Sequence, residues 1–369
     1  MAHARTAAIE EQPLQSYHTR RYYPARIGQT FETDTGLLQN WDTDEKSSQY
    51  TTLKVSVQTG DAETLPITNK IGMLRRSKKY ADKFDRPGPC FTRLARDIFE
   101  IDGPLGRHVC IAFKTQGASL RKMQEIFPNA QLPKLLVISL VHRLFFSVNW
   151  LHATCSVVHT DISPMNVLSE MEDEDCLKDI EISESYNPSA PIVDANGHPV
   201  YRSTELPAEL SGVPILTDFG QMLPAERCTG DIWCMPDLYR APEVLLKLRF
   251  GFPADMWSIG VMVNPELMEG RKLFDPVDRI NNQYVLPLIL AQYIGYLGPP
   301  PLEMIQKSPL FVTYFDKQED FATTIPPGDE KDEFLRFIRK LLTWDPEARA
   351  TTNEIHPDKW LMRRHEDMW

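Results

Sequence analysis

The sequence predicts an α+β fold in which a strand-rich first part precedes a longer, mainly helical part. Residues 22–113 contain short runs of β-branched and aromatic residues that alternate with polar ones, as half-buried strands do. From residue 132 onward, apolar residues recur every three or four positions, which is typical of helices. With 369 residues, the chain is long enough to form two lobes.

Two strands and one helix are predicted in the strand-rich part. Tyr50–Val57 is rich in β-branched residues and alternates as a strand should. Arg107–Phe113 is the second strand and follows a turn at Gly103–Gly106. Between them, Leu65–Lys79 has apolar residues at near-helical spacing and a basic end that suits a helix C-terminus.

The later part is predicted to contain three amphipathic or apolar helices, at Leu132–Thr154, Met256–Met268 and Phe334–Leu342. A further segment, Asn281–Leu302, is the longest window without a charged residue. Because this window contains several prolines and polar residues, we expect a buried helix that ends in a proline turn. We predict no membrane span.

The composition is that of an ordinary soluble globular protein, with 42% hydrophobic and 25% charged residues. Its six cysteines form no C-x-x-C pair and no zinc-ligand spacing, which favours reduced, mostly buried thiols in the cytoplasm or nucleus. The net charge of −11 argues against direct binding of nucleic acid and would attract basic partners. We expect a monomer.

A set of polar residues in the helical part indicates chemistry on a phosphate group. Asp161 is followed five residues later by the carboxamide of Asn166, and Asp218 lies downstream, after a strand end at Leu216–Thr217. Phosphoryl transfer needs a carboxylate that accepts the proton of the attacking hydroxyl, and oxygen ligands for Mg²⁺. We therefore assign Asp161 as the base and the other two residues as metal ligands. Gly220 is expected to allow a sharp bend after Phe219.

These residues resemble the motifs of protein kinases. His159–Asn166 is similar to the kinase catalytic loop, with Thr160 and Ser163 in place of an arginine and a lysine. Asp218–Gly220 is similar to the metal-binding loop of the same enzymes. Lys54, in the middle of the first predicted strand, resembles the strand lysine that contacts the α- and β-phosphates of ATP.

Further resemblance comes from residues that build the protein scaffold. Tyr239–Val244 resembles the A-P-E motif, whose glutamate pairs with a buried arginine, and Arg349 stands in the matching place. Asp255–Gly260 resembles the start of the central helix of the large lobe. The arginine before the A-P-E motif is similar to that of CMGC-group kinases. Thr160 in a His-Thr-Asp-Ile loop narrows the resemblance to SR-protein-kinase-like (SRPK-like) enzymes. Tyr22–Gly28 and Gly103–Gly117 resemble that family in its fungal form.

The resemblance implies a bilobal kinase fold with a small, incomplete β-rich N-lobe and a larger, mainly α-helical C-lobe. Residues 1–21 are expected to form a flexible arm, and residues 22–114 a truncated N-lobe. The C-lobe is expected at residues 115–369, with a polar inserted surface loop at residues 169–214.

The resemblance also implies ATP and Mg²⁺ as cofactors and serine residues of Arg/Ser-rich proteins as substrates. The expected catalytic residues are Asp161, Lys54 and Asn166. Residues expected to bind ATP are Lys54, Phe113, Thr115, Asn166 and Asp218, and those expected to bind the metal are Asn166 and Asp218.

Three departures from the kinase pattern concern the charges around the phosphates. No glycine-rich loop is found between Gly28 and Lys54. Lys70 stands where the glutamate that pairs with the strand lysine is expected, and Ser163 replaces the catalytic-loop lysine. Each loss removes electrostatic help in the transition state, which is often worth about 3 kcal/mol.

Three interpretations therefore remain from the sequence. The first is an active protein serine/threonine kinase. The second is a pseudokinase, in which the same fold binds basic partners without turnover. The third is a small-molecule phosphotransferase with a similar set of carboxylates, although Ala241–Glu243 and Arg349 argue against it because they form a platform for peptide substrates.

Overall fold

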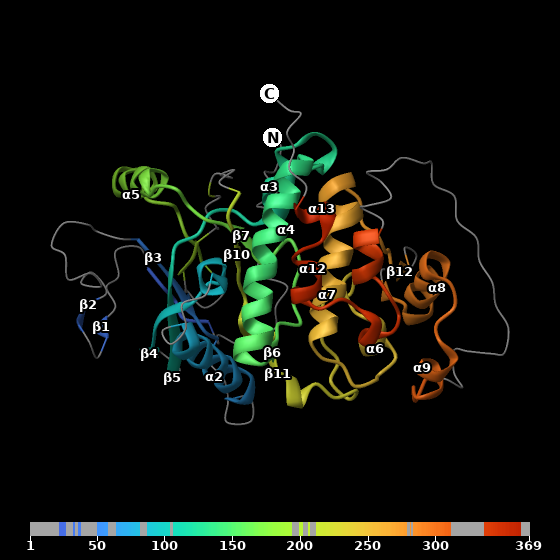
Figure 1. Cartoon of the computed structure of the whole chain (residues 1–369). Helices are drawn as coiled ribbons and strands as arrows, with labels where there is room; N and C mark the ends of the chain where they lie inside the picture. The colour runs from blue at the N-terminus through green and yellow to red at the C-terminus, as the bar shows by residue number, and fades with distance from the viewer. Residues whose placement is uncertain are drawn as a thin grey trace. The chain divides into compact units, whose positions relative to one another are not determined.

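The computed structural model describes residues 22–26, 32–33, 36–37, 50–57, 64–81, 87–103, 106–193, 199–201, 206, 212–278, 281, 283–310 and 336–362 (Figure 1). The chain divides into two compact units. The first comprises Met1–Arg75, Leu94–Gly117 and Met171–Pro207, and the second comprises Arg76–Arg93, Ala118–Glu170 and Ala208–Trp369. The predicted arm at residues 1–21 lies outside the described residues, as does most of the segment between Gly28 and Lys54.

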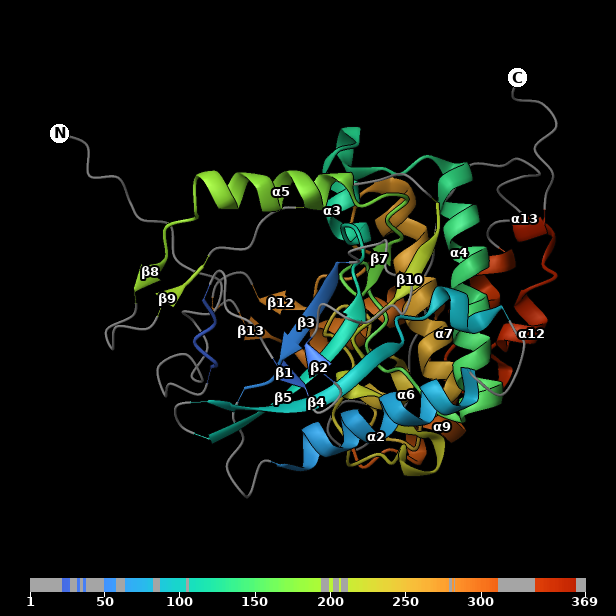
Figure 2. The ribbon, with the colours of Figure 1, turned by 90° about the vertical axis from the view of Figure 1, so that its left-hand side faces the viewer.

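The first unit contains a three-stranded antiparallel sheet in the order β3-β5-β4 (Figure 2). β3 (Thr51–Val55) and β5 (Gly106–Lys114) confirm the two predicted strands. β4 (Ala95–Gly103) was not predicted. Its charged residues fall on both faces, and an irregularity between Ala95 and Asp97 interrupts the pairing, so the sequence lacks a clean alternation.

The central strand, β5, forms the core of this sheet. Cys110, Ile111, Ala112 and Phe113 are all buried in succession, as expected of a strand covered on both faces. Burial raises the pKa of the Cys110 thiol to about 11. All six cysteines of the chain are free and four of them are buried, which confirms the prediction of mostly buried thiols.

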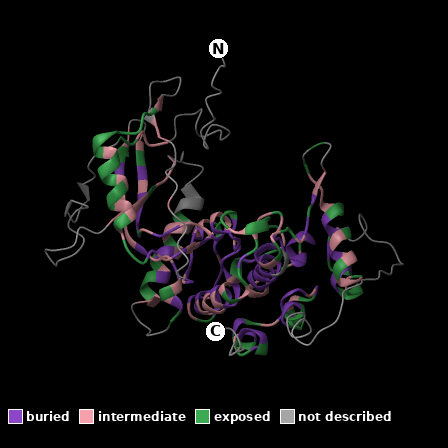
Figure 3. Cartoon of the chain, turned by 90° about the horizontal axis from the view of Figure 1, so that it is seen from above, coloured by how far each residue is buried: buried purple, intermediate pink, exposed green. Residues whose placement is uncertain are grey.

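The helix predicted at Leu65–Lys79 is confirmed as α2 (Thr64–Ala81), with Lys78 and Lys79 in its last turn. The predicted inserted loop contains a helix, α5 (Asp175–Tyr186), so the expectation of a surface loop was wrong there. No α5 residue is buried, so the helix has no apolar stripe that the sequence could reveal (Figure 3). The acidic residues before and in its first turn favour the helix N-terminus.

Three further pairs of short strands are described. β1 (Glu32–Thr33) pairs with β2 (Gly36–Leu37), and β8 (Ile192–Val193) pairs with β9 (Pro199–Val200). In the second unit, β12 (Val277–Asp278) pairs with β13 (Gln283–Tyr284). Met171–Pro207, including α5, groups with the first unit, and the predicted lobe boundaries at residues 22 and 115 stay predictions.

The second unit is built around α4 (Lys134–Asn149), which confirms the predicted helix at Leu132–Thr154. From Trp150 to Cys155 the helix continues as a π-helix, η5. The 3₁₀ helix η3 (Gly88–Phe91) and the short helices α12 (Thr352–Ile355) and α13 (Lys359–Met362) pack against α4 (Figure 1). The buried side chains of α4 are Val137, Ile138, Leu140, Val141, Leu144, Phe145, Ser147 and Val148.

One described helix, Lys134–Cys155, is long and apolar enough by length and composition to cross a membrane. In its most apolar window, 61% is buried inside the protein. Because these side chains contact other elements of the second unit, we interpret the segment as the core helix of that unit.

The helix predicted at Met256–Met268 is also confirmed. It begins as α7 (Phe252–Val261) and continues as a π-helix, η8 (Met262–Met268). Pro265 has no amide hydrogen, which explains why a regular α-helical ladder does not continue there. Residues 336–341 are helical, in agreement with the predicted helix at Phe334–Leu342.

The uncharged window Asn281–Leu302 contains α8 (Leu286–Leu297), which buries Ile289, Leu290 and Tyr293. The helix ends at Gly298, whose φ of 78° is easily adopted only by glycine. The prediction of a helix followed by a proline turn is therefore confirmed. The remaining helical elements of the second unit are α3 (Leu120–Glu125), η4 (Pro128–Ala130), η6 (Phe219–Gln221), η7 (Ala225–Arg227), α6 (Pro242–Leu245), α9 (Leu302–Gln306) and η9 (Pro346–Ala348).

Gly88 allows η3 to approach α4 closely. A Cβ atom at this position would lie 2.2 Å from Cβ of Trp150 and 2.7 Å from the carbonyl oxygen of Phe146. Real side chains do not come that close, and the helix backbone cannot move away without disturbing the core. The contact therefore requires glycine for reasons of space.

We expect Gly88→Ala to lower the free energy of unfolding by about 3 kcal/mol, because the added methyl group forces η3 away from α4. Urea denaturation of the purified chain measures this change. Gly295→Ala is the matched control in α8, since no atom lies within 4 Å of its Cβ position. Alanine should stabilise that helix by about 1 kcal/mol. Equal stability of Gly88→Ala and the wild type would contradict the packing argument.

Candidate active site

The loop that carries Asp161 and Asn166 lies between two short strands of the second unit, β6 (Val157–Val158) and β7 (Val167–Ser169). β6 pairs with β11 (Leu223–Pro224), and β7 pairs with β10 (Pro214–Leu216). β10 leads directly into Asp218. The amide of Thr217 donates to the carbonyl of Asn166 at 2.9 Å, so both segments are held together. The structure thus brings Asp161, Asn166 and Asp218 into one unit.

The carboxylate of Asp255, on the first turn of α7, fixes the start of this loop. Its two oxygens accept hydrogen bonds from the amides of His159 and Thr160, each at 2.8 Å. The ring of His152 donates a third hydrogen bond, from Nε2 to the carboxylate of Asp255, at 2.8 Å. Asp255 is fully buried, so its charge is balanced by these three donors in place of water.

Thr160 adopts a left-handed backbone conformation, with φ at 65°. A β-branched residue rarely takes this conformation, so the position is strained. Two hydrogen bonds hold it. The backbone amide of Thr160 donates to Asp255, and the Thr160 hydroxyl donates to the carbonyl of Gln221 at 2.8 Å. The threonine that replaces the arginine of the kinase motif thus connects the loop to the segment after Asp218.

His159 is buried and neutral. Its Nε2–H donates to the carbonyl of Thr217 at 3.0 Å, and its Nδ1 accepts from the amide of Asp161 at 3.2 Å. Only the neutral tautomer with hydrogen on Nε2 can make both bonds. Burial lowers the pKa of His159, partly offset by the charge of Asp255, in agreement with this assignment. The neutral ring positions the backbone of Asp161.

Asn166 is suited to hold a metal ion. Its side-chain Nδ2 donates to the carbonyl of Asp161 at 2.8 Å, which fixes the orientation of the amide and leaves Oδ1 as its acceptor atom. Hard carboxylate and amide oxygens are the ligands that divalent cations such as Mg²⁺ prefer. The amide oxygen of Asn166 and the carboxylate of Asp218 therefore fit a divalent metal ion.

The bend at Asp218 differs from the prediction. Asp218 itself has a φ of 60°, while Gly220 is not among the glycines with positive φ. The bend expected after Phe219 is the 3₁₀ turn η6 (Phe219–Gln221), in which Gly220 has no positive φ, and the left-handed residue before it was not predicted. An aspartate tolerates the left-handed region better than most residues because its short polar side chain bonds locally. The strained residue is the candidate metal ligand itself.

Arg93 is a neighbour of Asp218 that the sequence did not reveal. Its amide donates to the carbonyl of Leu216 at 2.9 Å, and Thr92 forms an isolated parallel bridge with Leu216. Burial lowers the pKa of Arg93 to about 10, and the negative charge of Asp218 opposes this effect. A cation from a distant segment therefore acts on the carboxylate. No motif in the sequence identifies it.

Lys54, Phe113 and Thr115 belong to the first unit. Thr52 lies opposite Phe113 in the β3–β5 pair, and Lys54 lies opposite Ile111. The hydroxyl of Thr52 bonds to that of Thr115 at 3.3 Å. Lys54 is exposed, whereas the side chain of Phe113 is buried. Lys70 lies on α2, and the roles of these residues toward ATP stay predictions.

The predicted ion pair between Glu243 and Arg349 is confirmed. Nη1 and Nη2 of Arg349 donate to the two oxygens of Glu243 at 2.8 and 3.0 Å, and both residues are buried. Arg349 also donates to the carbonyls of Pro253 and Thr343. The guanidinium thus connects α6, the start of α7 and the segment before η9.

The segment before α6 is held by Arg240. Its guanidinium donates to the carbonyls of Cys234 and Met235, at 2.9 and 2.7 Å, and lies 4.1 Å from the ring centre of Trp233. Met235 has a φ of 70°, so the side chain of Arg240 holds another residue with a strained backbone. The prediction that the residues around the A-P-E motif are scaffold residues agrees with these contacts.

A second polar cluster near the catalytic loop was not predicted. Glu266 accepts hydrogen bonds from both the guanidinium of Arg121 and the hydroxyl of Tyr239. The amide of Arg121 donates to the carbonyl of Pro164, within the catalytic loop, at 3.0 Å. Burial raises the pKa of Tyr239, and the charge of Glu266 acts in the same direction. These residues are far apart in sequence, so spacing gave no signal.

The chain is similar in sequence to known proteins. Residues 209–361 match the protein kinase domain. This match covers less than half of the 369-residue chain. The α+β fold of the chain and its A-P-E and metal-binding segments agree with the match.

Several protein kinases are similar to the chain over most of its length. A serine/threonine protein kinase of Aspergillus fumigatus is 28% identical over 381 residues, covering 96% of this chain and 91% of the relative. The serine/threonine-protein kinase SRPK of Physarum polycephalum is 24% identical and covers 94% and 91%. The dual specificity protein kinase CLK4 of Mus musculus is 26% identical and covers 70% and 51%.

These matches support a serine/threonine kinase with SRPK and CMGC relatives at modest identity. Protein kinase domains in general use ATP and a divalent metal ion and act on protein substrates. The match to a protein kinase domain disfavours the interpretation as a small-molecule phosphotransferase.

Asp255→Asn should release the loop that carries Asp161 and Asn166. The amide group replaces one acceptor oxygen with a donor, so one of three buried donors loses its partner. We expect the free energy of unfolding to fall by about 3 kcal/mol. Hydrogen exchange at the amides of His159 and Thr160 should accelerate by at least about tenfold. Asp179→Asn on exposed α5 is the control, and unchanged exchange in Asp255→Asn would refute the anchoring role.

A double-mutant cycle on Glu243 and Arg349 tests the buried ion pair. Glu243→Gln and Arg349→Met should each cost about 3–5 kcal/mol, because each leaves a buried charge unpaired. The double variant should cost clearly less than the sum of the two single variants. Urea unfolding measures all four proteins. Additive losses would show that the pair is not coupled.

Proposed function

We propose that this chain is an ATP- and Mg²⁺-dependent kinase that phosphorylates serine and threonine hydroxyls of Arg/Ser-rich proteins. The observation that carries the proposal is the fixed loop from His159 to Asn166. Asp255 anchors its start, and the Asn166 side chain closes it onto the carbonyl of Asp161. The kinase relatives support the reaction class.

In the proposed reaction, Asp161 orients the substrate hydroxyl and accepts its proton. The hydroxyl oxygen forms a bond to the γ-phosphorus, the bond from this phosphorus to the β–γ bridging oxygen breaks, and ADP leaves. Asp161 lies in a loop whose backbone is held by neutral His159 and buried Asp255. The carboxylate therefore begins the reaction close to its required position.

Asn166 and Asp218 would hold the magnesium ion, which supplies charge neutralisation on the phosphates when bound. Lys54 would contact the α- and β-phosphates, and Phe113 and Thr115 would contact the nucleotide. For Phe113, whose side chain is buried, the backbone is the group that remains for such a contact.

The substrate class is supported by charge and by relatives. A net charge of −11 favours encounters with arginine-rich chains, and one relative is named SRPK. We propose an intracellular monomer, in the cytoplasm or nucleus, that binds protein substrates and no nucleic acid directly.

A pseudokinase is the second candidate. Ser163, which is buried beside the candidate base, carries no positive charge where the family motif has a lysine. Lys70 cannot form the ion pair with Lys54 that a glutamate would form. Under this interpretation, the same anchored loop is a scaffold for basic partners without turnover.

Phosphate transfer from ATP and Mg²⁺ to an Arg/Ser-rich peptide separates these candidates. We expect Asp161→Ala to reduce transfer by about 10²–10⁴-fold, because the hydroxyl loses its proton acceptor. Asp179→Ala on exposed α5 is the matched control and should keep wild-type activity. Equal background transfer by the wild type and Asp161→Ala would rule out the kinase proposal.

Ser163→Lys sharpens the same experiment. Restoring the positive charge of the family motif should raise transfer by roughly tenfold if Asp161 and the metal ligands are functional. Peptide binding by an inactive wild-type chain, with no gain in Ser163→Lys, would instead favour the pseudokinase scaffold.

A further inference from the structure

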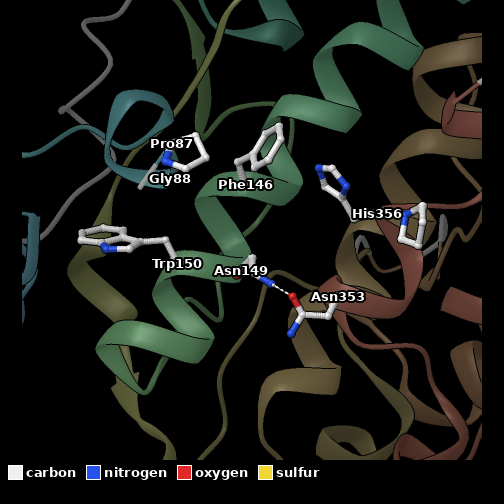
Figure 4. Close-up of a pocket in the computed structure, with 8 residues that line it drawn as sticks. Pro87, Gly88, Phe146, Asn149, Trp150, Asn353 and His356 are labelled. Atoms are coloured by element: carbon white, nitrogen blue, oxygen red, sulfur yellow. Dashed lines mark hydrogen bonds between the residues drawn. The ribbon is translucent and has the colours of Figure 1, made fainter. Parts of the chain in front are cut away.

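A small pocket in the second unit contains none of the residues assigned to phosphoryl transfer. Three segments that are distant in sequence line it (Figure 4). They are Pro87–Gly88, the end of α4 and the start of η5 (Phe146, Asn149 and Trp150), and three residues near the C-terminal end of the described chain (Asn353, His356 and Pro357). Its volume is about 310 Å³. This is at the lower end of the range for small-molecule sites, so one or two fused rings would fill it.

Aromatic and proline rings form most of its walls. The centres of the Phe146 and His356 rings are 4.5 Å apart, and the ring planes meet at 65°. Phe91 stacks on Phe146 at 5.9 Å, and the ring centre of His142 lies 4.6 Å from that of His356. These neighbours hold the two lining rings in place. Fixed ring edges and faces favour a flat, aromatic occupant.

The lining is electrically neutral. The eight lining residues include no aspartate, glutamate, lysine or arginine. Burial lowers the pKa of His356, the one titratable residue among them, so its ring is neutral near pH 7. A charged group entering the pocket would lose water without gaining a counter-ion. The pocket therefore favours a neutral ligand and disfavours nucleotide phosphates.

Two asparagines give the pocket a polar edge. Nδ2 of Asn149 donates to the hydroxyl of Thr352 at 2.9 Å and to Oδ1 of Asn353 at 2.5 Å (Figure 4). Both hydrogens on Nδ2 of Asn149 are thereby used, which leaves its carbonyl oxygen as an acceptor and the NH₂ group of Asn353 as a donor. An acceptor beside a donor matches the two hydrogen-bonding groups of an amide.

Two of the lining residues also have buried ring nitrogens that lack hydrogen-bond partners within the described part of the chain. They are Nε1 of Trp150 and Nε2 of His356. An unsatisfied buried polar atom costs about 1–3 kcal/mol, and such atoms are commonly met by water or by a ligand.

We propose that this pocket binds a small, neutral, planar aromatic amide, or a heteroaromatic molecule with an equivalent donor–acceptor edge. The ring lies between Phe146, His356 and the flanking prolines, and the polar edge faces Asn149 and Asn353. Such a ligand joins three separate segments of the fold. It therefore stabilises the second unit independently of phosphoryl transfer.

Benzamide is the probe for this site. Saturation-transfer NMR with the full-length chain should show contact between the probe and the protein, and the melting temperature should rise with probe concentration. Benzoate has the same ring with a negative charge and should bind at least about tenfold more weakly. Cyclohexanecarboxamide keeps the amide without the flat ring and should also bind more weakly.

Asn353→Trp should abolish benzamide binding by filling the mouth of the pocket. Asn353 is exposed, so this variant should melt within about 3 °C of the wild type without the probe. Asn187→Trp, at another exposed position, is the matched control and should bind benzamide normally. Asn353→Ala keeps the pocket open and should weaken binding by removing the donor.

Absence of any benzamide signal with the wild type would overturn the proposal. Undiminished binding by Asn353→Trp would also overturn it, because the probe would then bind elsewhere. Benzoate binding as tight as benzamide binding would refute the neutral character of the site. These readouts do not depend on catalytic activity, so the pocket and the proposed kinase function fail or succeed separately.

Discussion

The carboxylate of Asp255 is the interaction on which the arrangement of the catalytic loop depends. It is a buried charge, and its desolvation is offset only because the amides of His159 and Thr160 and the ring of His152 all donate to it. The same bonds hold Thr160 in a conformation that its side chain disfavours. Asp255 belongs to a core helix, so the geometry of the loop follows from the packing of the second unit.

Residues that build the fold match the kinase pattern more completely in this chain than the charged residues of the motifs do. The buried pair of Glu243 and Arg349 and the contacts of Arg240 are those of a well-formed large lobe. In the segments that resemble the kinase motifs, by contrast, Ser163 and Lys70 stand where the family has a lysine and a glutamate. Ser163 is buried in its loop and Lys70 is half-buried on α2, so both are accommodated by the packing of the chain without the charges of the family motif. Loss of activity and retention of the fold are physically compatible here.

Local patterns in the sequence predicted the long helices, two strands of the sheet and the Glu243–Arg349 pair. These features depend on periodicity or on short motifs with fixed roles. The helix α5 was missed because it buries no apolar face, and β4 because a bulge breaks its alternation. Arg93 and the cluster around Glu266 could not be found, since only folding brings these residues to the loop. The left-handed backbone at Asp218 was not predicted, because a glycine two residues later is the residue type that usually permits such a conformation.

Strain at Thr160 and Asp218 links stability and function in this chain. Both residues hold a left-handed backbone conformation that glycine would adopt without cost. Selection for a more stable protein would therefore favour glycine at these two positions. The same change would free the backbone beside the candidate base and delete a candidate metal ligand. A chain that no longer needed catalysis could thus gain stability at this site, whereas this chain keeps threonine and aspartate at the two left-handed positions.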